Sequence, residues 1–203
     1  MHVLDSRCFI YSVTQKYQRN VIMDSTFDKQ LDQFVAAFVS YHQEGERNLL
    51  ISYDPKWPSP CYQGEANNDG SVAWMPVRQA SPATFSNVEE ALGIRLNAEF
   101  CAFFSRYYSD NLSAMAPQGQ CELLQVFNSD DLVRLQQNLI GHLLMKKRLK
   151  QEPTLFFALT DEEDYVLSVL NRTGEVVLEQ VGRPPKDVVA ESLGAFISSL
   201  SPR

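Results

Sequence analysis

The stretch that decides the fold is NLIGHLLMKKRLKQEPTLF, which runs from Asn138 to Phe156. Its first part continues a long helix that we predict to begin after a Ser129 cap and to end at about Leu149. Pro153 stops this helix, because proline disfavours helical backbone in the residue before it. The charges at the two ends complement the helix dipole: Asp130 and Asp131 lie in the first turn, and Lys146, Lys147, Arg148 and Lys150 lie at the end.

The last part of that stretch begins a run of three predicted strands. Short apolar segments at Thr154–Leu159, Tyr165–Leu170 and Val176–Val181 are separated by turn residues. The first turn is the acidic run Asp161–Asp164, and the second is Asn171–Gly174. Such closely spaced strands predict an antiparallel meander.

The remaining elements surround this meander. Helical spacing of apolar residues predicts helices at about Thr26–Gln43 and Lys186–Leu200, and a strand is predicted at Glu122–Phe127. The sequence therefore predicts a single α+β domain with a mostly antiparallel central sheet flanked by helices. We assign residues 23–203 to this domain and residues 1–22, which show no sustained periodicity, to a poorly ordered N-terminal extension.

Composition excludes several classes of protein. The net charge of the 203 residues is −7, and a charge of +2 in residues 1–22 leaves −7 − 2 = −9 for residues 23–203. An acidic chain repels phosphate backbones, so we expect no nucleic-acid partner. No apolar run approaches the roughly 20 residues that a transmembrane helix needs, and the N-terminus lacks a convincing signal peptide. The four scattered cysteines are typical of reduced thiols, so we expect a cytoplasmic protein.

Catalytic motifs are missing from the chain. It contains no nucleophile elbow, zinc-protease motif, phosphate-binding loop or dinucleotide-binding glycine pattern. Cys61 and His142 could form a thiol–imidazole pair, although the sequence identifies no residue to orient it. Neither a histidine nor a cysteine lies four residues after His142, so no metal or other cofactor is predicted.

Carboxylates are the remaining candidates for a functional site. The pairs Glu89–Glu90 and Asp130–Asp131 suit helix N-termini, where acids are stabilised without any further role. The run Asp161–Asp164 places four acids on one tight turn, where like charges repel. This turn is either a solvated loop tip or an acidic surface that receives a basic segment.

Several short motifs spread along the chain form a recognisable set. They are Asn138–Leu143, Lys147–Lys150, Pro153–Phe156, Pro58–Cys61, Trp74 with Pro76, Ser129–Asp131 and Gly174–Val176. Together they resemble the Syd family of SecY-interacting proteins. The matching segments occur in that family's order and spacing and cover the chain from about Asp24 to the C-terminus.

The resemblance implies an α+β fold of the SUKH superfamily and a binding protein without enzymatic activity. It implies docking to SecY, the translocon channel, at the cytoplasmic face of the inner membrane, and a role in monitoring or restraining SecY complexes. An acidic concave surface would meet the basic cytoplasmic loops of SecY. From charge alone, the candidates for this surface are Glu89, Glu90, Asp110, Glu122, Asp161, Glu162, Glu163 and Asp164, with Trp57 and Trp74 as candidate anchors.

Two alternatives remain open from the sequence. Relatives with the SUKH fold neutralise basic toxins through an acidic face, so an immunity protein has the same charge pattern. A cysteine-dependent enzyme would use Cys61 and His142 and would require an accessible Cys61 thiol.

Overall fold

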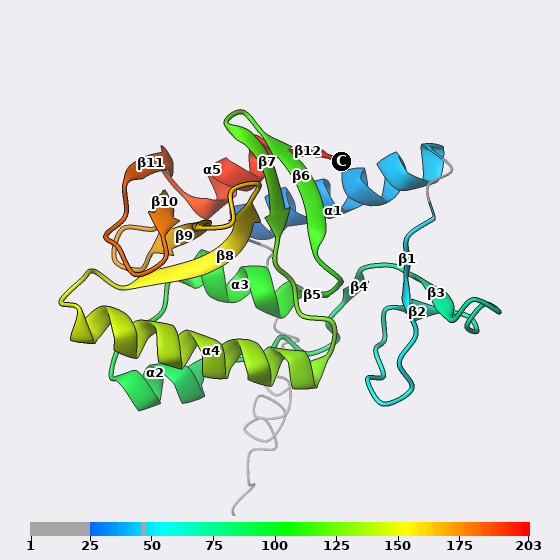
Figure 1. The fold of residues 1–203 in the computed structure, drawn as a ribbon, viewed down its shortest axis with the longest axis horizontal. Helices are drawn as coiled ribbons and strands as arrows, with labels where there is room; N and C mark the ends of the chain where they lie inside the picture. Colours follow the sequence, from blue (N-terminus) through cyan, green and yellow to red (C-terminus); the bar gives the residue numbers. More distant parts are fainter. Residues whose placement is uncertain (1–24, 46–47) are drawn as a thin grey trace, which may run out of the picture.

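The computed structural model describes residues 25–45 and 48–203, so the predicted extension at residues 1–22 lies outside the described residues. Its centre is a curved, seven-stranded sheet whose neighbouring strands are all antiparallel, in the order β11-β10-β9-β8-β7-β6-β12 (Figure 1). The α+β prediction with a mostly antiparallel sheet is confirmed. The strands are β6 (Leu112–Ala116), β7 (Gly119–Leu123), β8 (Thr154–Thr160), β9 (Tyr165–Leu170), β10 (Val176–Gln180), β11 (Asp187–Ala190) and β12 (Ser201–Pro202).

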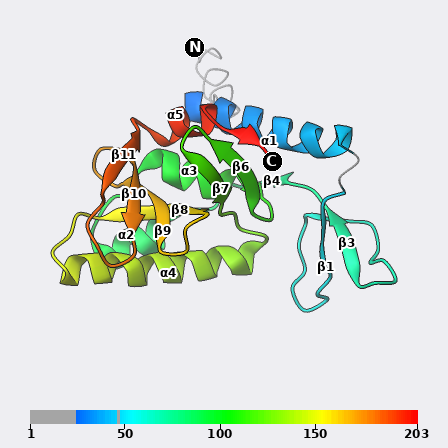
Figure 2. The same ribbon diagram turned by 45° about the horizontal axis from the view of Figure 1, so that its top comes forward.

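Helices cover this sheet, and a small second sheet extends away from it. In Figure 2, α4 and α2 lie below the large sheet, and α1 and α5 lie above it. The small sheet has the order β1-β3-β2, and a two-stranded ladder pairs β4 with β5. The helices are α1 (Thr26–Glu44), α2 (Ser86–Leu92), α3 (Ala98–Arg106), α4 (Ser129–Arg148) and α5 (Leu193–Ser198); the short strands are β1 (Leu50–Ser52), β2 (Tyr62–Gln63), β3 (Ser71–Trp74), β4 (Val77–Arg78) and β5 (Tyr107–Tyr108).

The predicted helix–strand stretch from 138 to 156 is confirmed as the end of α4 and the start of β8. The predicted start of α4 was wrong by one residue, because Asn128 and not Ser129 is the N-cap. The Asn128 side chain accepts a hydrogen bond of 2.9 Å from the backbone N–H of Asp131. An N-cap residue lies just before the first helical residue, so Ser129 is the first residue of α4 and not its cap.

The two faces of the central sheet have different neighbours, because successive side chains on a strand point to opposite faces. Towards α4, Thr154 hydrogen bonds to His142 at 3.0 Å, and the ring of Phe156 contacts the His142 ring edge-on. On the other face, Phe157 packs against Phe103 of α3 and Phe196 of α5. Nonpolar packing therefore dominates the α3–α5 face, whereas polar groups lie beneath α4.

A buried ion pair joins α4 to the sheet. Lys146 and Glu179 of β10 have 0% and 1% of their side chains exposed and form a salt bridge. The Lys146 ammonium also donates hydrogen bonds to the Gln151 side chain at 3.2 Å and to the Arg183 carbonyl at 3.3 Å. The prediction that the basic end of this helix only complements the helix dipole was therefore wrong for Lys146, which holds the β10–β11 connection against α4.

The predicted C-terminal helix at Lys186–Leu200 was also wrong in its first half. Residues 187–190 form the edge strand β11, in which Asp187 pairs with Leu178 of β10. The helix α5 begins only after Ser192, whose hydroxyl accepts a hydrogen bond of 3.0 Å from the Ala195 N–H. The predicted strand at Glu122–Phe127 is displaced towards the N-terminus, because β7 ends at residue 123.

Candidate binding site

The acidic turn between β8 and β9 is stabilised by its own hydrogen bonds. The Thr160 hydroxyl donates to the Glu162 carbonyl at 3.0 Å and accepts from the Glu162 N–H at 3.2 Å. The Tyr165 N–H also donates to the Glu162 carbonyl, at 3.0 Å. All four acidic side chains of the turn are exposed. The carboxylates are therefore presented to solvent from a well-formed turn.

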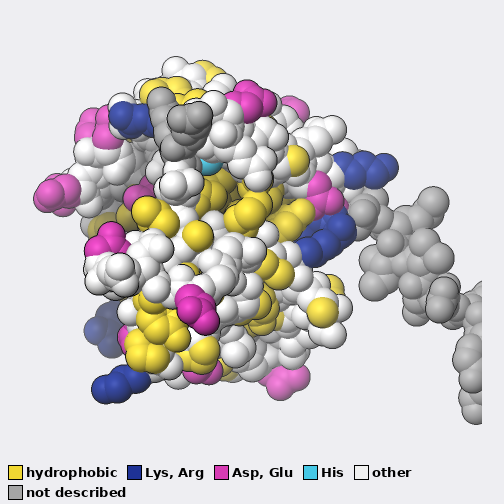
Figure 3. All heavy atoms as spheres, turned by 90° about the vertical axis from the view of Figure 1, so that its right-hand side faces the viewer, with side chains coloured by type: hydrophobic (Ala, Val, Ile, Leu, Met, Phe, Trp, Pro, Cys, Tyr) yellow, Lys and Arg dark blue, Asp and Glu magenta, His cyan; other side chains and the backbone are white. Residues whose placement is uncertain are grey.

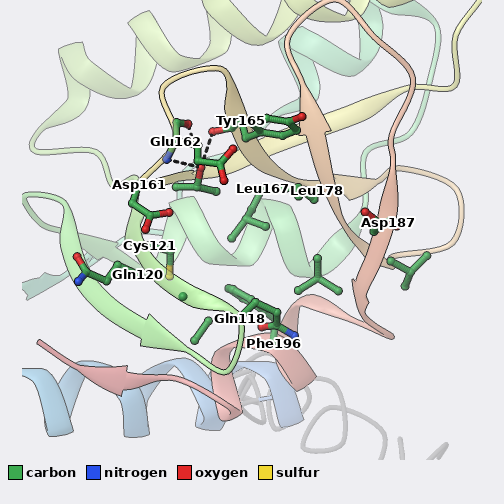
Figure 4. A pocket seen from close by; sticks show the side chains of 15 residues that line it. Gln118, Gln120, Cys121, Asp161, Glu162, Tyr165, Leu167, Leu178, Asp187 and Phe196 are labelled. Carbon is green, nitrogen blue, oxygen red and sulfur yellow. Dashed lines mark hydrogen bonds between the residues drawn. The ribbon is translucent and has the colours of Figure 1, made fainter.

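Two of these acids border a cavity of about 290 Å³ that opens beside the turn (Figure 4). The strands β7 and β11 are separated by three strands in the sheet order, yet both contribute to it, so the sheet curves around the cavity. Its apolar lining comes from several strands and α5, and its polar lining from β7, β11, the adjoining ends of β8 and β9, and the turns. The apolar lining is Ala116, Cys121, Leu167, Leu178, Val188, Val189 and Phe196; the others are Gln118, Gly119, Gln120, Thr160, Asp161, Glu162, Tyr165 and Asp187.

The charge of this cavity has one sign. Asp161, Glu162 and Asp187 line it, and no lysine, arginine or histidine does so among the described residues. We call this feature the acidic cavity. In Figure 4, Asp187 lies across the cavity from Asp161 and Glu162. Because like charges surround an open space, the potential there is negative and favours a cationic ligand.

A second hollow of about 260 Å³ extends the site. It shares Asp161 and three other residues with the acidic cavity and adds Glu122 and Arg203 to the lining. The Glu122 carboxylate accepts a hydrogen bond of 2.8 Å from Asn111. Because Arg203 lines this second hollow together with Asp161 and Glu122, the hollow carries charges of both signs. We therefore treat it as secondary to the acidic cavity.

Asp110 belongs to the same acidic neighbourhood but is partly buried. Burial raises the pKa of its carboxyl above the usual value, and the nearby charges of Glu122 and Asp131 raise it further, against a lowering hydrogen bond from the Asn111 N–H. Because its side chain is partly buried, Asp110 is less accessible to a partner than the exposed acids of the turn.

The remaining predicted acids do not line the acidic cavity. Glu89 and Glu90 border a separate hollow of about 310 Å³ near α2. Glu89 accepts hydrogen bonds from the Leu96 N–H at 2.9 Å and from Arg95 at 2.8 Å, so its charge serves local structure. Glu163 and Asp164 share the acidic turn with Asp161 but do not line the acidic cavity.

Neither predicted tryptophan anchor borders the acidic cavity. The partly buried Trp57 ring stacks under the Arg134 guanidinium, whose central carbon lies 3.9 Å from the ring centroid. Trp74 is 4% exposed and lines a hollow of about 240 Å³ with His42 and Leu49.

Apolar side chains gather on the face shown in Figure 3, which views the molecule from the side of the small sheet.

The two residues of the thiol–imidazole alternative have other partners. Cys61 has 0% exposure, its thiol contacts the Phe127 carbonyl at 3.8 Å, and burial raises its pKa to about 11. His142 hydrogen bonds to Thr154, and burial lowers its pKa. A buried thiol with a raised pKa is a poor nucleophile, so the geometry gives this alternative no support.

Within residues 25–45 and 48–203, no group of three histidine, cysteine, aspartate or glutamate side chains could hold a metal ion. Within the same ranges, no helix is both long and apolar enough to cross a membrane.

Sequence reasoning found Asp161, Glu162 and Glu122 but missed Asp187 and the apolar cavity wall. Asp187 stood at the start of the helix predicted at Lys186–Leu200 and was not singled out as a candidate. The available signal was Val188–Val189, separated by two residues from Pro184–Pro185, since adjacent β-branched residues favour a strand.

Comparisons with known proteins identify the family. The family model for Syd protein (SUKH-2) matches residues 28–202. "Protein Syd" from Alteromonas mediterranea is 58% identical over 180 residues, which cover 89% of this chain and 98% of the relative. Proteins of the same name from Pseudoalteromonas atlantica and Colwellia psychrerythraea are 43% and 38% identical, over 89% and 88% of this chain and 98% and 94% of theirs. This chain therefore belongs to the Syd protein family.

Proposed function

We propose that this chain is a binding protein, not an enzyme, and that its acidic cavity docks onto basic cytoplasmic loops of the SecY translocon channel. The observation that carries the proposal is the acidic cavity, with three carboxylates and no cation in its described lining. Cytoplasmic loops of membrane proteins are enriched in lysine and arginine, so they supply the complementary charge. Membership of the Syd family supports SecY as the partner.

Electrostatics would act in two ways in this complex. Exposed carboxylates attract a basic loop over about 10 Å at 0.1 M salt, which accelerates association and orients the partner. Apolar contacts inside the cavity would then add affinity that salt does not screen. We therefore expect binding that salt weakens but does not abolish.

The proposed location and role follow from this contact. The protein would be cytoplasmic and peripheral at the inner membrane, held there through SecY and not by direct insertion into lipid. By occupying basic loops of SecY, it would monitor or restrain SecY complexes.

The test is co-sedimentation with inner-membrane vesicles that contain either normal or raised amounts of SecY, at low and high salt. A double charge reversal, Asp161→Lys with Glu162→Lys, is expected to remove most SecY-dependent binding. The matched control, Glu44→Lys with Glu65→Lys, makes the same change in net charge on exposed residues outside the acidic cavity. Equal binding by the two variants, or binding that does not increase with SecY, would contradict the proposal.

A further inference from the structure

The acidic cavity is lined by two kinds of surface. Phe196 and Leu167, which are 1% and 5% exposed, line it together with the partly exposed Leu178. Phe196 is fixed by an edge-on contact with Phe157, with ring centroids 5.6 Å apart. The carboxylates lie around this apolar surface, on the β8–β9 turn and on β11 (Figure 4). A ligand that fills the cavity must therefore combine an apolar part with a positive charge.

The arrangement of the carboxylates limits which kind of cation fits the cavity. Asp161 and Glu162 belong to one wall and Asp187 to the opposite wall. The described residues around the cavity include no three side chains close enough to share a metal ion. Separated carboxylates suit a broad cation with several hydrogen-bond donors, which can reach more than one of them.

We propose that the acidic cavity is a socket for one arginine side chain of the basic partner. This inference rests on the proposed function in one respect, namely that the partner is a basic polypeptide segment. The aliphatic stem of the arginine lies against Leu167, Leu178 and Phe196, and its guanidinium group hydrogen bonds to the carboxylates. Long cationic side chains commonly bury their stems in this way while the charged end remains near water.

Arginine fits this site better than lysine for two reasons. Its planar guanidinium has five N–H donors and pairs bidentately with carboxylates, whereas an ammonium group acts as a compact point charge. The guanidinium is also more weakly hydrated and stacks on aromatic rings, and the Tyr165 ring lines the cavity between the two acidic walls.

The test titrates the full chain with N-acetyl-arginine methylamide and follows the methyl NMR signals of Leu167, Leu178 and Val189. N-acetyl-citrulline methylamide, which has the same shape without the charge, and the lysine analogue serve as matched ligands. We expect saturable shifts at these methyl groups with arginine and binding weaker by roughly tenfold or more with citrulline, because charge-assisted hydrogen bonds are lost. Equal shifts with arginine and citrulline, tighter binding of lysine, or shifts spread away from the cavity would overturn the inference.

Two variants connect the shifts to the cavity. Leu178→Trp is expected to fill the cavity and abolish arginine binding without changing net charge. Asp187→Asn changes an exposed side chain and is expected to weaken binding of the arginine ligand but not of the citrulline ligand. The control, Glu191→Gln, changes an exposed side chain outside the cavity and is expected to leave the binding of both ligands unchanged. If Asp187→Asn and Glu191→Gln behave alike, the inference is wrong, even should Leu178→Trp fail to fold.

The failure of this inference is distinguishable from the failure of the proposed function. SecY-dependent sedimentation with no arginine binding in the cavity would overturn only the socket. Arginine binding with no SecY-dependent sedimentation would overturn only the choice of partner.

Discussion

The two faces of the central sheet both carry charges but satisfy them in opposite ways. Beneath α4, Lys146 is fully buried, and its three ammonium donors meet the Glu179 carboxylate, the Gln151 side chain and the Arg183 carbonyl. On the other face, Asp161 and Asp187 are exposed, and no cation lines their cavity among the described residues.

Solvent access explains the difference. A buried charge loses its hydration, so an internal partner must compensate it. An exposed carboxylate keeps its hydration and needs no internal partner, which leaves it available to another molecule. A charge on the α4 face is therefore bound up with the fold, whereas the exposed charges on the other face can be changed at little cost to stability and remain free for the proposed docking. The predictions below test this separation.

The largest expected effect comes from Lys146→Met. Removing one member of a buried ion pair leaves the Glu179 charge without compensation and is expected to destabilise the fold by about 3–5 kcal/mol. Urea denaturation measures the change in the free energy of unfolding.

A second substitution controls for this interpretation. Adding Glu179→Met to Lys146→Met removes the uncompensated charge, and much of the lost stability is expected to return. A double variant that is less stable than Lys146→Met would show that the two charges do not act as a pair.

The sequence predicted the helix that carries Lys146 but not the burial of its side chain. Capping residues and dipole-complementing charges are local features, so they fixed the extent of α4 to within about one residue. The burial of Lys146 depends on Glu179, which is 33 residues further along the chain, by 179 − 146. Position at a basic helix end gives no information about such a distant partner.

The next effect concerns binding. The triple variant Asp161→Asn, Glu162→Gln and Asp187→Asn neutralises the acidic cavity. We expect affinity for SecY-containing vesicles to fall by on the order of tenfold or more, with weaker dependence on salt. Each exposed substitution should change the free energy of unfolding by no more than about 0.5 kcal/mol. A large loss of stability would assign these acids to the fold, and unchanged affinity with unchanged salt dependence would show that they do not contribute to docking.

A smaller effect is expected from pH on the α4 face. Burial lowers the pKa of His142 below its usual value of 6.5, and the facing Lys146 also lowers it, whereas Glu179 and the contact with Thr154 raise it. Between the lowered pKa and 6.5 the unfolded chain binds more protons, so stability falls as pH falls through this window.

His142→Gln should remove this part of the acid sensitivity. Urea denaturation from pH 7.5 to 5 measures the free energy of unfolding of the unsubstituted protein and of His142→Gln. Both proteins keep Lys146, because its charge itself shifts the pKa of His142. An unchanged dependence on pH in His142→Gln would mean that other groups, and not this histidine, cause the loss of stability.

The candidate site was predictable only where it was local. The acidic turn follows from four successive acids between two apolar segments, and Asp161 and Glu162 were found in this way. The β6–β7 hairpin had a usable signal in the alternation of Leu112, Ala114 and Ala116, which are all buried. The position of Asp187 depends instead on pairing between β10 and β11 and on the curvature of the whole sheet, which no short segment encodes.

The smallest expected effect tests whether the position of a carboxylate in the acidic turn matters, or only the total charge of the turn. Asp161 and Asp164 belong to the same exposed turn, but only Asp161 lines the acidic cavity. Asp161→Asn should weaken binding to SecY-containing vesicles more than Asp164→Asn, which should change it by no more than about twofold because an exposed charge outside the contact is largely screened. Equal losses would mean that the turn acts through its total charge. Unequal losses would show that the cavity selects which of two neighbouring carboxylates contributes to recognition.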